Sequence, residues 1–155
     1  MEIDSDISLI LEKESIVFEN LVIRTIKIYK EQKEIREVTQ IQLLNWPDHV
    51  KPLDSYLIYH LIDFVDKGKT FGPVIVHCSA GNGRTGCFIA IYNIVQCLRL
   101  LKEVNQELQQ NIKPFFSVFN ICRRLREQRQ GVISSSEQYK FVYEFAAAYS
   151  QKLFF

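Results

Sequence analysis

Residues 77–86 read HCSAGNGRTG. Within this segment Cys78 and Arg84 stand at the two ends of a short, glycine-containing loop. Apolar residues precede it at 73–76 and follow it at 87–92, which predicts a buried strand before the segment and a helix after it. Backbone N–H groups of a loop that opens a helix converge on one point, and the helix dipole adds positive potential there. The segment therefore predicts an oxyanion site, in which the field favours the thiolate of Cys78 and the planar fork of Arg84 can bind two phosphoryl oxygens.

Cys78 is the candidate nucleophile, because a thiolate at this position can attack phosphorus and form a phosphocysteine intermediate. Arg84 is the candidate clamp for the phosphoryl oxygens. The alternatives are a small buried apolar residue at a strand end for Cys78 and a surface ion pair for Arg84. The candidate phosphate-binding residues are Ser79, Ala80, Gly81, Asn82, Gly83 and Arg84.

Two further motifs accompany this loop. Residues 36–49 read REVTQIQLLNWPDH, and residues 125–131 read LREQRQG, followed by SEQY at 136–139. With these motifs in this order, the chain resembles the cysteine-dependent protein tyrosine phosphatases over about residues 16–149. The signature of that family is His-Cys, five residues, Arg, and then Ser or Thr.

The resemblance implies roles for four more residues. Asp48 would be the general acid, whose alternative is a turn aspartate after proline. Gln138 would orient the hydrolytic water, and Thr85 would ease departure of the thiolate; their alternatives are a helix-surface glutamine and a first-turn cap. His77 would order the loop and steady the thiolate. The family uses neither a metal nor an organic cofactor.

Three positions depart from the family pattern. Val50 stands where the family has a glycine, which predicts impaired closure of the Asp48 loop. Asn82 replaces an aliphatic residue of the phosphate loop, and Ser134 replaces the first glutamine of the family's glutamine loop. These changes bear on the rate of hydrolysis more than on phosphate binding.

Alternating β-branched residues and apolar residues at helical spacing predict a mixed α/β chain with the order of elements that follows. The predicted strands are 21–30, 38–44 and 74–77, and the first two predicted helices are 53–67 and 84–103. A third helix is predicted to be capped by Ser117, after an interruption at Lys113-Pro114. A last helix is predicted to start near Ser135 or Ser136, with these residues facing inward: Tyr139, Val142, Tyr143 and Ala146. We expect a single domain, residues 1–155, in which helices flank a mixed, twisted sheet. The resemblance implies that the family's strands and helices before Phe18 are missing, including the glutamate that pairs with Arg84.

The charge composition of the chain limits the classes of partner that it is expected to bind. Nineteen basic and 18 acidic residues give a net charge of +1, which offers no electrostatic case for nucleic acid or an anionic membrane. The start of the chain is acidic and no apolar run approaches the roughly 20 residues of a spanning helix, so a cytosolic or nuclear protein is expected, with its four cysteines free. The arginines of the 123–129 segment are interpreted as a solvated helix face.

The sequence thus predicts a protein tyrosine phosphatase that acts on phosphotyrosine-containing proteins or peptides. The alternative is a truncated pseudophosphatase that binds phosphotyrosine proteins or a signalling partner and turns over little. A compact dual-specificity phosphatase suits the length, but the Trp46-Pro47-Asp48 and Glu137-Gln138-Tyr139 motifs argue against it. Missing early strands also predict self-association through an exposed sheet edge.

Overall fold

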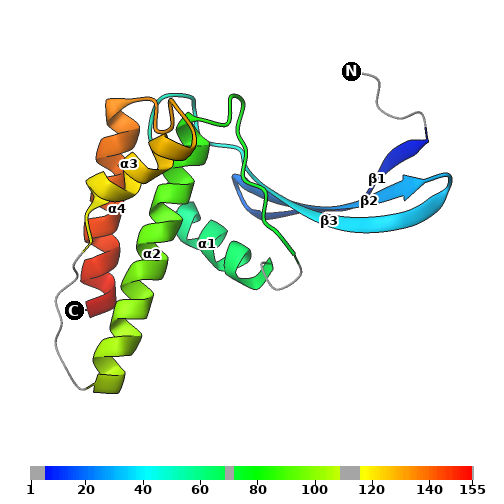
Figure 1. Ribbon diagram of the computed structural model, residues 1–155. Helices are drawn as coiled ribbons and strands as arrows, with labels where there is room; N and C mark the ends of the chain where they lie inside the picture. Colours follow the sequence, from blue (N-terminus) through cyan, green and yellow to red (C-terminus); the bar gives the residue numbers. More distant parts are fainter. Residues whose placement is uncertain (1–5, 69–71, 109–115, 155) are drawn as a thin grey trace. The chain divides into compact units, whose positions relative to one another are not determined.

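The computed structural model describes residues 6–68, 72–108 and 116–154. It contains three strands and four helices, in the order βββαααα (Figure 1). The chain divides into two compact units, Met1–Asn45 and Trp46–Phe155. The predicted interruption at Lys113-Pro114 lies outside the described residues.

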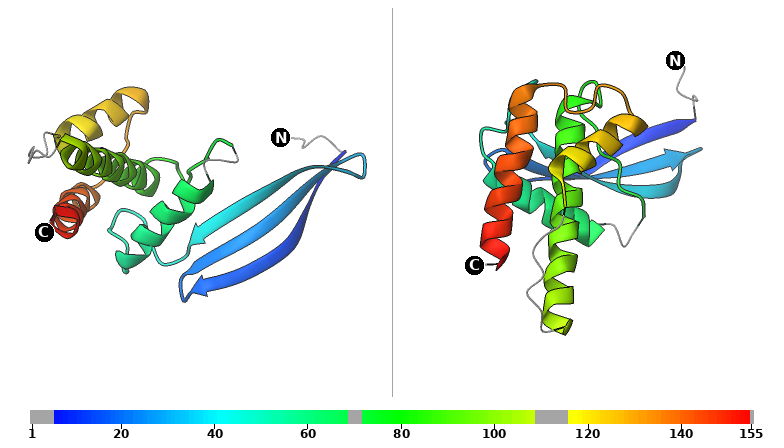
Figure 2. Two further views of the ribbon diagram at one scale, coloured as in Figure 1. Left: turned by 90° about the horizontal axis from the view of Figure 1, so that it is seen from below. Right: turned by 60° about the vertical axis from the view of Figure 1, so that its left-hand side comes forward.

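The first unit is an antiparallel sheet in the order β1-β2-β3 (Figures 1 and 2). Its strands are β1 (Ile7–Phe18), β2 (Leu21–Lys30) and β3 (Lys33–Leu43). Glu31 and Gln32 join the last two strands with φ angles of 49° and 65°, and two such residues form the two-residue turn whose twist suits a hairpin. The strands predicted at 21–30 and 38–44 are confirmed, and the second begins earlier than expected.

Strand β1 was not predicted. It pairs antiparallel with β2 from Ile7 opposite Lys30 to Phe18 opposite Leu21, with two register shifts. Long apolar side chains on β1 are exposed, among them Leu9 at 66% and Ile16 at 71%. A strand at the edge of a sheet leaves one row of backbone groups unpaired; β1 and β3 are both edges of this sheet, and β1, with more exposed apolar side chains, is the edge through which we expect the predicted self-association.

The second unit contains helices α1 (Tyr56–Gly68), α2 (Gly83–Leu108), α3 (Val118–Gln128) and α4 (Ser136–Phe154). Helices α2 and α4 lie side by side in both views (Figures 1 and 2). Helix α2 supplies the centre of the core, because its apolar residues recur at three- and four-residue spacing along one face. These buried residues are Cys87, Ala90, Ile91, Ile94, Val95 and Leu98.

Two helix starts follow the predicted capping residues. The Ser117 side chain accepts a hydrogen bond from the Asn120 N–H at the start of α3, and the Ser135 hydroxyl accepts one from the Gln138 N–H at 3.1 Å. Both are N-cap interactions that satisfy otherwise unpaired N–H groups. The inward face predicted for the last helix is wrong in part: Tyr143 is 43% exposed, while the helix buries Gln138, Phe141, Val142, Phe145, Ala146 and Tyr149.

The strand predicted at 74–77 is absent, and residues 73–78 have no regular secondary structure. A β-strand requires a neighbour to take its backbone hydrogen bonds, and the sheet of the described residues contains β1, β2 and β3 alone. Ile75, which was expected in a buried strand, is 84% exposed. In the parts of the chain that the structure describes, no helix is long and apolar enough to cross a membrane.

Candidate active site

The loop between Cys78 and Arg84 runs directly into α2, which begins at Gly83. Gly81 has a φ of +69°, a conformation that glycine adopts without steric cost. The carbonyl of Asn82 accepts the N–H of Gly86 at 2.9 Å, closing the first helical turn. The predicted arrangement of a loop that opens a helix is therefore present.

The surroundings of Cys78 favour its thiolate. Partial burial acts to raise the pKa of the thiol, but hydrogen bonds from the Thr85 hydroxyl and from the backbone N–H groups of Thr85, Gly81 and Asn82 outweigh it and lower the pKa to about 7. Thr85 Oγ1 is buried beside this sulfur and makes no hydrogen bond of regular geometry among the described residues. Converging donors of this kind are what makes a cysteine a nucleophile near neutral pH.

The ring of His77 is exposed and lies at the edge of this environment. Its Nδ1 is 3.5 Å from the carbonyl oxygen of Cys78, at the outer limit of a hydrogen bond. The role implied for His77 stays a prediction.

Two glycines of the loop and the first turn of α2 permit close packing against the start of α4. A Cβ atom at Gly86 would lie 2.2 Å from Val132 Cγ1. At Gly83 it would lie 2.8 Å from Ser134 Oγ and 2.9 Å from Gln138 Oε1. Such distances are impossible for real atoms, so any larger residue at these positions would displace the loop from its support.

Arg84 contacts the loop that carries the candidate general acid. Its guanidinium forms an ion pair with Asp48 at 2.6 Å and donates a hydrogen bond to the Trp46 carbonyl at 2.9 Å. Arg84 Nε is buried and has no partner within the described residues. The structure therefore brings Arg84, at the end of the loop that starts at Cys78, into contact with Asp48, which their separation in the sequence could not show.

The Asp48 loop is fixed at its start by Trp46, which is 6% exposed. The Trp46 indole N–H donates to the carbonyl of Val50 at 2.9 Å and its ring packs edge-on against Phe141, with centroids 6.5 Å apart. The left-handed position in this loop is His49, with a φ of 64°, and Val50 has no positive φ. The valine that replaces the family's glycine is thus free of backbone strain here.

The start of α4 holds the far side of the same loop. Ser135, the N-cap of α4, donates its hydroxyl to the carbonyl of His49. The Lys51 N–H donates to the Glu137 carboxylate at 3.3 Å, and the Lys51 ammonium lies 3.8 Å from Glu144. These contacts connect the loop of the candidate acid to the helix that carries Gln138.

Gln138 is fully buried under the start of α2. Its Oε1 lies 3.5 Å from Ser134 Oγ, and its Nε2 has no partner in the described part of the chain. The alternative of an exposed helix-surface glutamine is therefore excluded for Gln138. Ser134 contacts this amide, although it is shorter than the glutamine it replaces.

Two arginines that were interpreted as part of a solvated face have specific contacts. Arg126 donates to the carbonyls of Val132 and Ile133, both at 3.0 Å. Arg129 donates to Asn82 Oδ1 at 2.8 Å and to the Ala80 carbonyl at 3.2 Å. The sequence could indicate that these two arginines have specific contacts, because they lie at the end of a helix just before a glycine, where long side chains stand beside a turn. It could not identify Asn82, 47 residues away, as the partner of Arg129.

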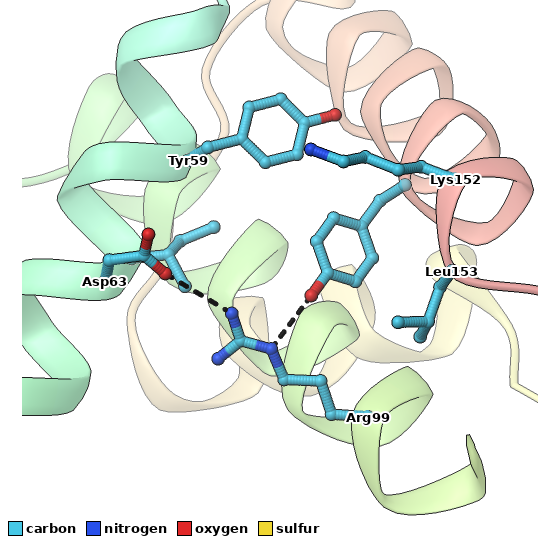
Figure 3. Close-up of a pocket in the computed structure, with 7 residues that line it drawn as sticks. Tyr59, Asp63, Arg99, Lys152 and Leu153 are labelled. Carbon is cyan, nitrogen blue, oxygen red and sulfur yellow. Dashed lines mark hydrogen bonds and ion pairs between the residues drawn. The ribbon is translucent and has the colours of Figure 1, made fainter.

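A hollow of about 200 Å³ lies apart from these residues, among helices α1, α2 and α4 (Figure 3). Arg99 at its base donates to the Tyr149 hydroxyl at 2.8 Å and pairs with Asp63 at 3.5 Å and with Asp66. The charge of Arg99 is thus already balanced, and the hollow contains none of the predicted site residues. Among the described residues no cluster of three His, Cys, Asp or Glu side chains is arranged to hold a metal ion.

Residues 2–148 match the family model described as protein-tyrosine phosphatase, and the chain belongs to this family. It is 36% identical over 142 residues to mouse tyrosine-protein phosphatase non-receptor type 18 (PTPN18) and 34% identical over 119 residues to Dictyostelium discoideum tyrosine-protein phosphatase 2. These alignments cover 88% and 77% of this chain. The family match begins well before residue 16, where the resemblance was first placed.

The fold agrees with this assignment. A structure of PTPN18 in complex with HER2 phosphopeptides superposes with a TM-score of 0.78 at 29% identity, covering 96% of this chain and 52% of that one. The chain thus spans about half the length of the solved catalytic domain and about 28% of the mouse relative. It is mixed α/β, with three antiparallel strands and four helices that correspond to about half of such a domain.

Proposed function

We propose that the protein hydrolyses phosphotyrosine through a phosphocysteine intermediate. The observation that carries this proposal is a single loop that holds the Cys78 thiol, whose pKa is lowered to about 7, and ends at Arg84, whose guanidinium lies 2.6 Å from the Asp48 carboxylate. The N–H groups of residues 79–84 complete a set of donors suited to three phosphoryl oxygens. We further infer that the described elements form part of a larger twisted sheet flanked by helices, as in the solved relatives.

In the first step the Cys78 thiolate attacks phosphorus, forming an S–P bond as the bond to the tyrosine oxygen breaks. Asp48, when protonated, transfers its proton to the departing oxygen. Arg84 and the loop N–H groups stabilise the charge on the equatorial oxygens throughout. Because Arg84 pairs with Asp48 at 2.6 Å, a phosphoryl group bound by the guanidinium competes with this carboxylate.

In the second step water attacks phosphorus, Asp48 accepts the proton of that water, and the S–P bond breaks to regenerate the Cys78 thiolate. The Thr85 hydroxyl, which lies beside the sulfur, stabilises the departing thiolate. Gln138 is placed beside the loop with a free N–H donor and would orient the water. No metal or organic cofactor enters either step.

The proposed substrates are phosphotyrosine-containing proteins or peptides. PTPN18 has been solved in complex with HER2 phosphopeptides, and the same chemical class is proposed for this chain. The non-receptor relatives support a cytosolic or nuclear location.

A second candidate function is that of a binding protein with slow turnover. Ser134 favours it, because a serine hydroxyl reaches less far toward an attacking water than the glutamine it replaces. The two functions share phosphate binding and differ in the rate of the second step. Accumulation of phosphocysteine, detected by mass spectrometry after acid quenching, would indicate the slower protein.

Turnover of p-nitrophenyl phosphate, with vanadate as inhibitor, tests the proposal. Cys78→Ser should abolish turnover and retain oxyanion binding, since it removes the anionic nucleophile and leaves the donors. Arg84→Lys should be severely impaired, because a point charge cannot reproduce a bidentate grip. Cys97→Ser, on the exposed part of α2, is the matched control and should keep full turnover; turnover of Cys78→Ser within tenfold of the wild type contradicts the proposal.

A further inference from the structure

One side chain from outside the phosphate loop reaches across to hold it. Arg129 caps the C-terminal end of α3, where its own N–H bonds the carbonyl of Leu125. Its guanidinium then donates to two loop acceptors, Asn82 Oδ1 at 2.8 Å and the Ala80 carbonyl at 3.2 Å. A planar fork with several donors can make both bonds at once.

The guanidinium also packs directly on the residue between these two acceptors. A Cβ atom at Gly81 would lie 3.3 Å from Arg129 Nη2 and 3.7 Å from its Cζ. Gly81 therefore has a positive φ and in addition carries the guanidinium against its backbone. The guanidinium thus bonds Ala80 and Asn82 and lies beside the glycine between them.

The consequence for the nucleophile follows from the geometry of the peptide bond. The carbonyl of Ala80 and the N–H of Gly81 belong to one planar trans peptide, so they point in opposite directions. Because Arg129 fixes the carbonyl, it also fixes the direction of the N–H. That N–H is one of the donors to the Cys78 sulfur.

Asn82 contributes the acceptor that holds the guanidinium in place. Its backbone carbonyl accepts hydrogen bonds from the N–H groups of Gly86 at 2.9 Å and Ile133 at 3.3 Å. These two bonds fix the backbone from which the Asn82 side chain extends. An aliphatic residue at this position has no acceptor to offer Arg129. Asn82, a departure from the family pattern, thus has a specific partner in this chain.

We propose that Asn82 and Arg129 form a positioning pair that holds the Ala80–Gly81 peptide with its N–H directed at the Cys78 sulfur. The proposal deepens the function proposed above and rests on it, since the pair acts only through the nucleophile. Its alternative is that Arg129 merely stabilises the end of α3. A structural role of that kind changes the melting temperature but not the acidity of a thiol in the folded protein.

The test is the pH dependence of Cys78 alkylation by iodoacetamide, measured on the full chain by peptide mass spectrometry, with Cys97 in the same sample as reference. We expect the midpoint of the Cys78 profile to rise by about one pH unit in Arg129→Met and Asn82→Ala, which lowers its rate at pH 6 about tenfold. In the double variant the midpoint should rise no further than in Arg129→Met alone, as for two residues in one contact. Arg123→Met, an exposed arginine of the same helix paired with Glu127, should leave the profile unchanged.

An unchanged Cys78 midpoint in folded Arg129→Met or Asn82→Ala overturns the proposal, as does a double variant equal to the sum of the two single effects. If Arg129→Met does not fold by circular dichroism, Arg129→Lys takes its place, because lysine keeps the charge but cannot hold both acceptors in a fixed plane. A wild-type midpoint at the ordinary value of a free thiol would instead count against the proposed function. The two failures are therefore distinguishable.

Discussion

Replacing Asp48 by asparagine should separate the two functions of this carboxylate. As proton donor, Asp48 should be worth roughly two to four orders of magnitude in turnover of phosphotyrosine. As the partner of Arg84 at 2.6 Å, it competes with any oxyanion for the same guanidinium. We therefore expect Asp48→Asn to hydrolyse phosphotyrosine far more slowly and yet to bind an oxyanion more tightly.

The exposure of the pair sets the size of the gain in binding. The Asp48 side chain is 59% exposed and that of Arg84 is 25% exposed, so water screens their attraction and the pair belongs with surface ion pairs, worth about 0.2 to 1 kcal/mol. Loss of that competition lowers a dissociation constant about 1.5- to 5-fold. Loss of a buried ion pair would have implied a far larger change in the dissociation constant.

The assay is calorimetric titration with tungstate at fixed ionic strength, alongside kinetics on aryl phosphates of graded leaving-group acidity. Asp63→Asn is the matched control, because Asp63 is also 59% exposed and also pairs with an arginine, Arg99, outside the site. Asp63→Asn should change neither the affinity for tungstate nor the rates on the aryl phosphates. Weaker tungstate binding by Asp48→Asn would refute the competition, and an equal loss of rate for good and poor leaving groups would refute the role of proton donor.

Three further predictions concern packing, acidity and assembly. Gly86→Ala places a Cβ 2.2 Å from Val132 Cγ1 and should cost about 1 to 3 kcal/mol of stability, or roughly 2 to 12 °C in melting temperature. Gly68→Ala, where no atom of the described residues lies within 4 Å of the added Cβ, is the control, and an equal effect of both would contradict the packing argument. The rate of Cys78 alkylation should rise about tenfold per pH unit up to a midpoint near 7 and level off above it. Because this pKa is lower in the folded state, the thiolate stabilises the fold at high pH, and that stabilisation is lost as the pH falls through 7. A midpoint of alkylation near 9 would contradict both statements. Leu9→Lys on β1 should shift size-exclusion elution toward the monomer, whereas Leu100→Lys on α2, 62% exposed beside 66% for Leu9, should not; elution of the wild type as a monomer at all concentrations would exclude association through β1.

The helices could be predicted because their signals are local. Ser117 and Ser135 begin α3 and α4 as caps, and the apolar spacing of α2 identifies its buried face. The strand predicted at 74–77 failed for the opposite reason: an apolar run becomes a strand only beside another strand, and the sequence of the run does not contain that information. Strand β1 was missed because its register is set by β2, and many of its side chains are exposed.

The site shows the same division between local and distant information. The Cys78 to Arg84 spacing was sufficient to predict a loop that opens a helix, because one stretch of backbone makes it, and the binding of phosphate by that loop stays a prediction. The contacts of Arg129 with Asn82 and of Arg126 with Ile133 were not predictable, because a side chain that crosses to another loop leaves no periodic pattern. The replacement of glycine by Val50 predicted impaired closure of the Asp48 loop, which stays a prediction; the positive φ of this loop belongs to His49, a position that the sequence did not indicate.

The unpaired polar atoms of this site share a property that bears on its ligand. Arg84 Nε, Gln138 Nε2 and Thr85 Oγ1 are buried, have no partner among the described residues, and can all donate a hydrogen bond. A buried donor without a partner costs about 1 to 3 kcal/mol, a cost that proteins carry chiefly where a ligand relieves it. Donors alone cannot satisfy one another, so these atoms stay unpaired until a group rich in acceptors enters. Phosphoryl oxygens accept hydrogen bonds and donate none when ionised, so these unpaired donors support the class of substrate that we propose.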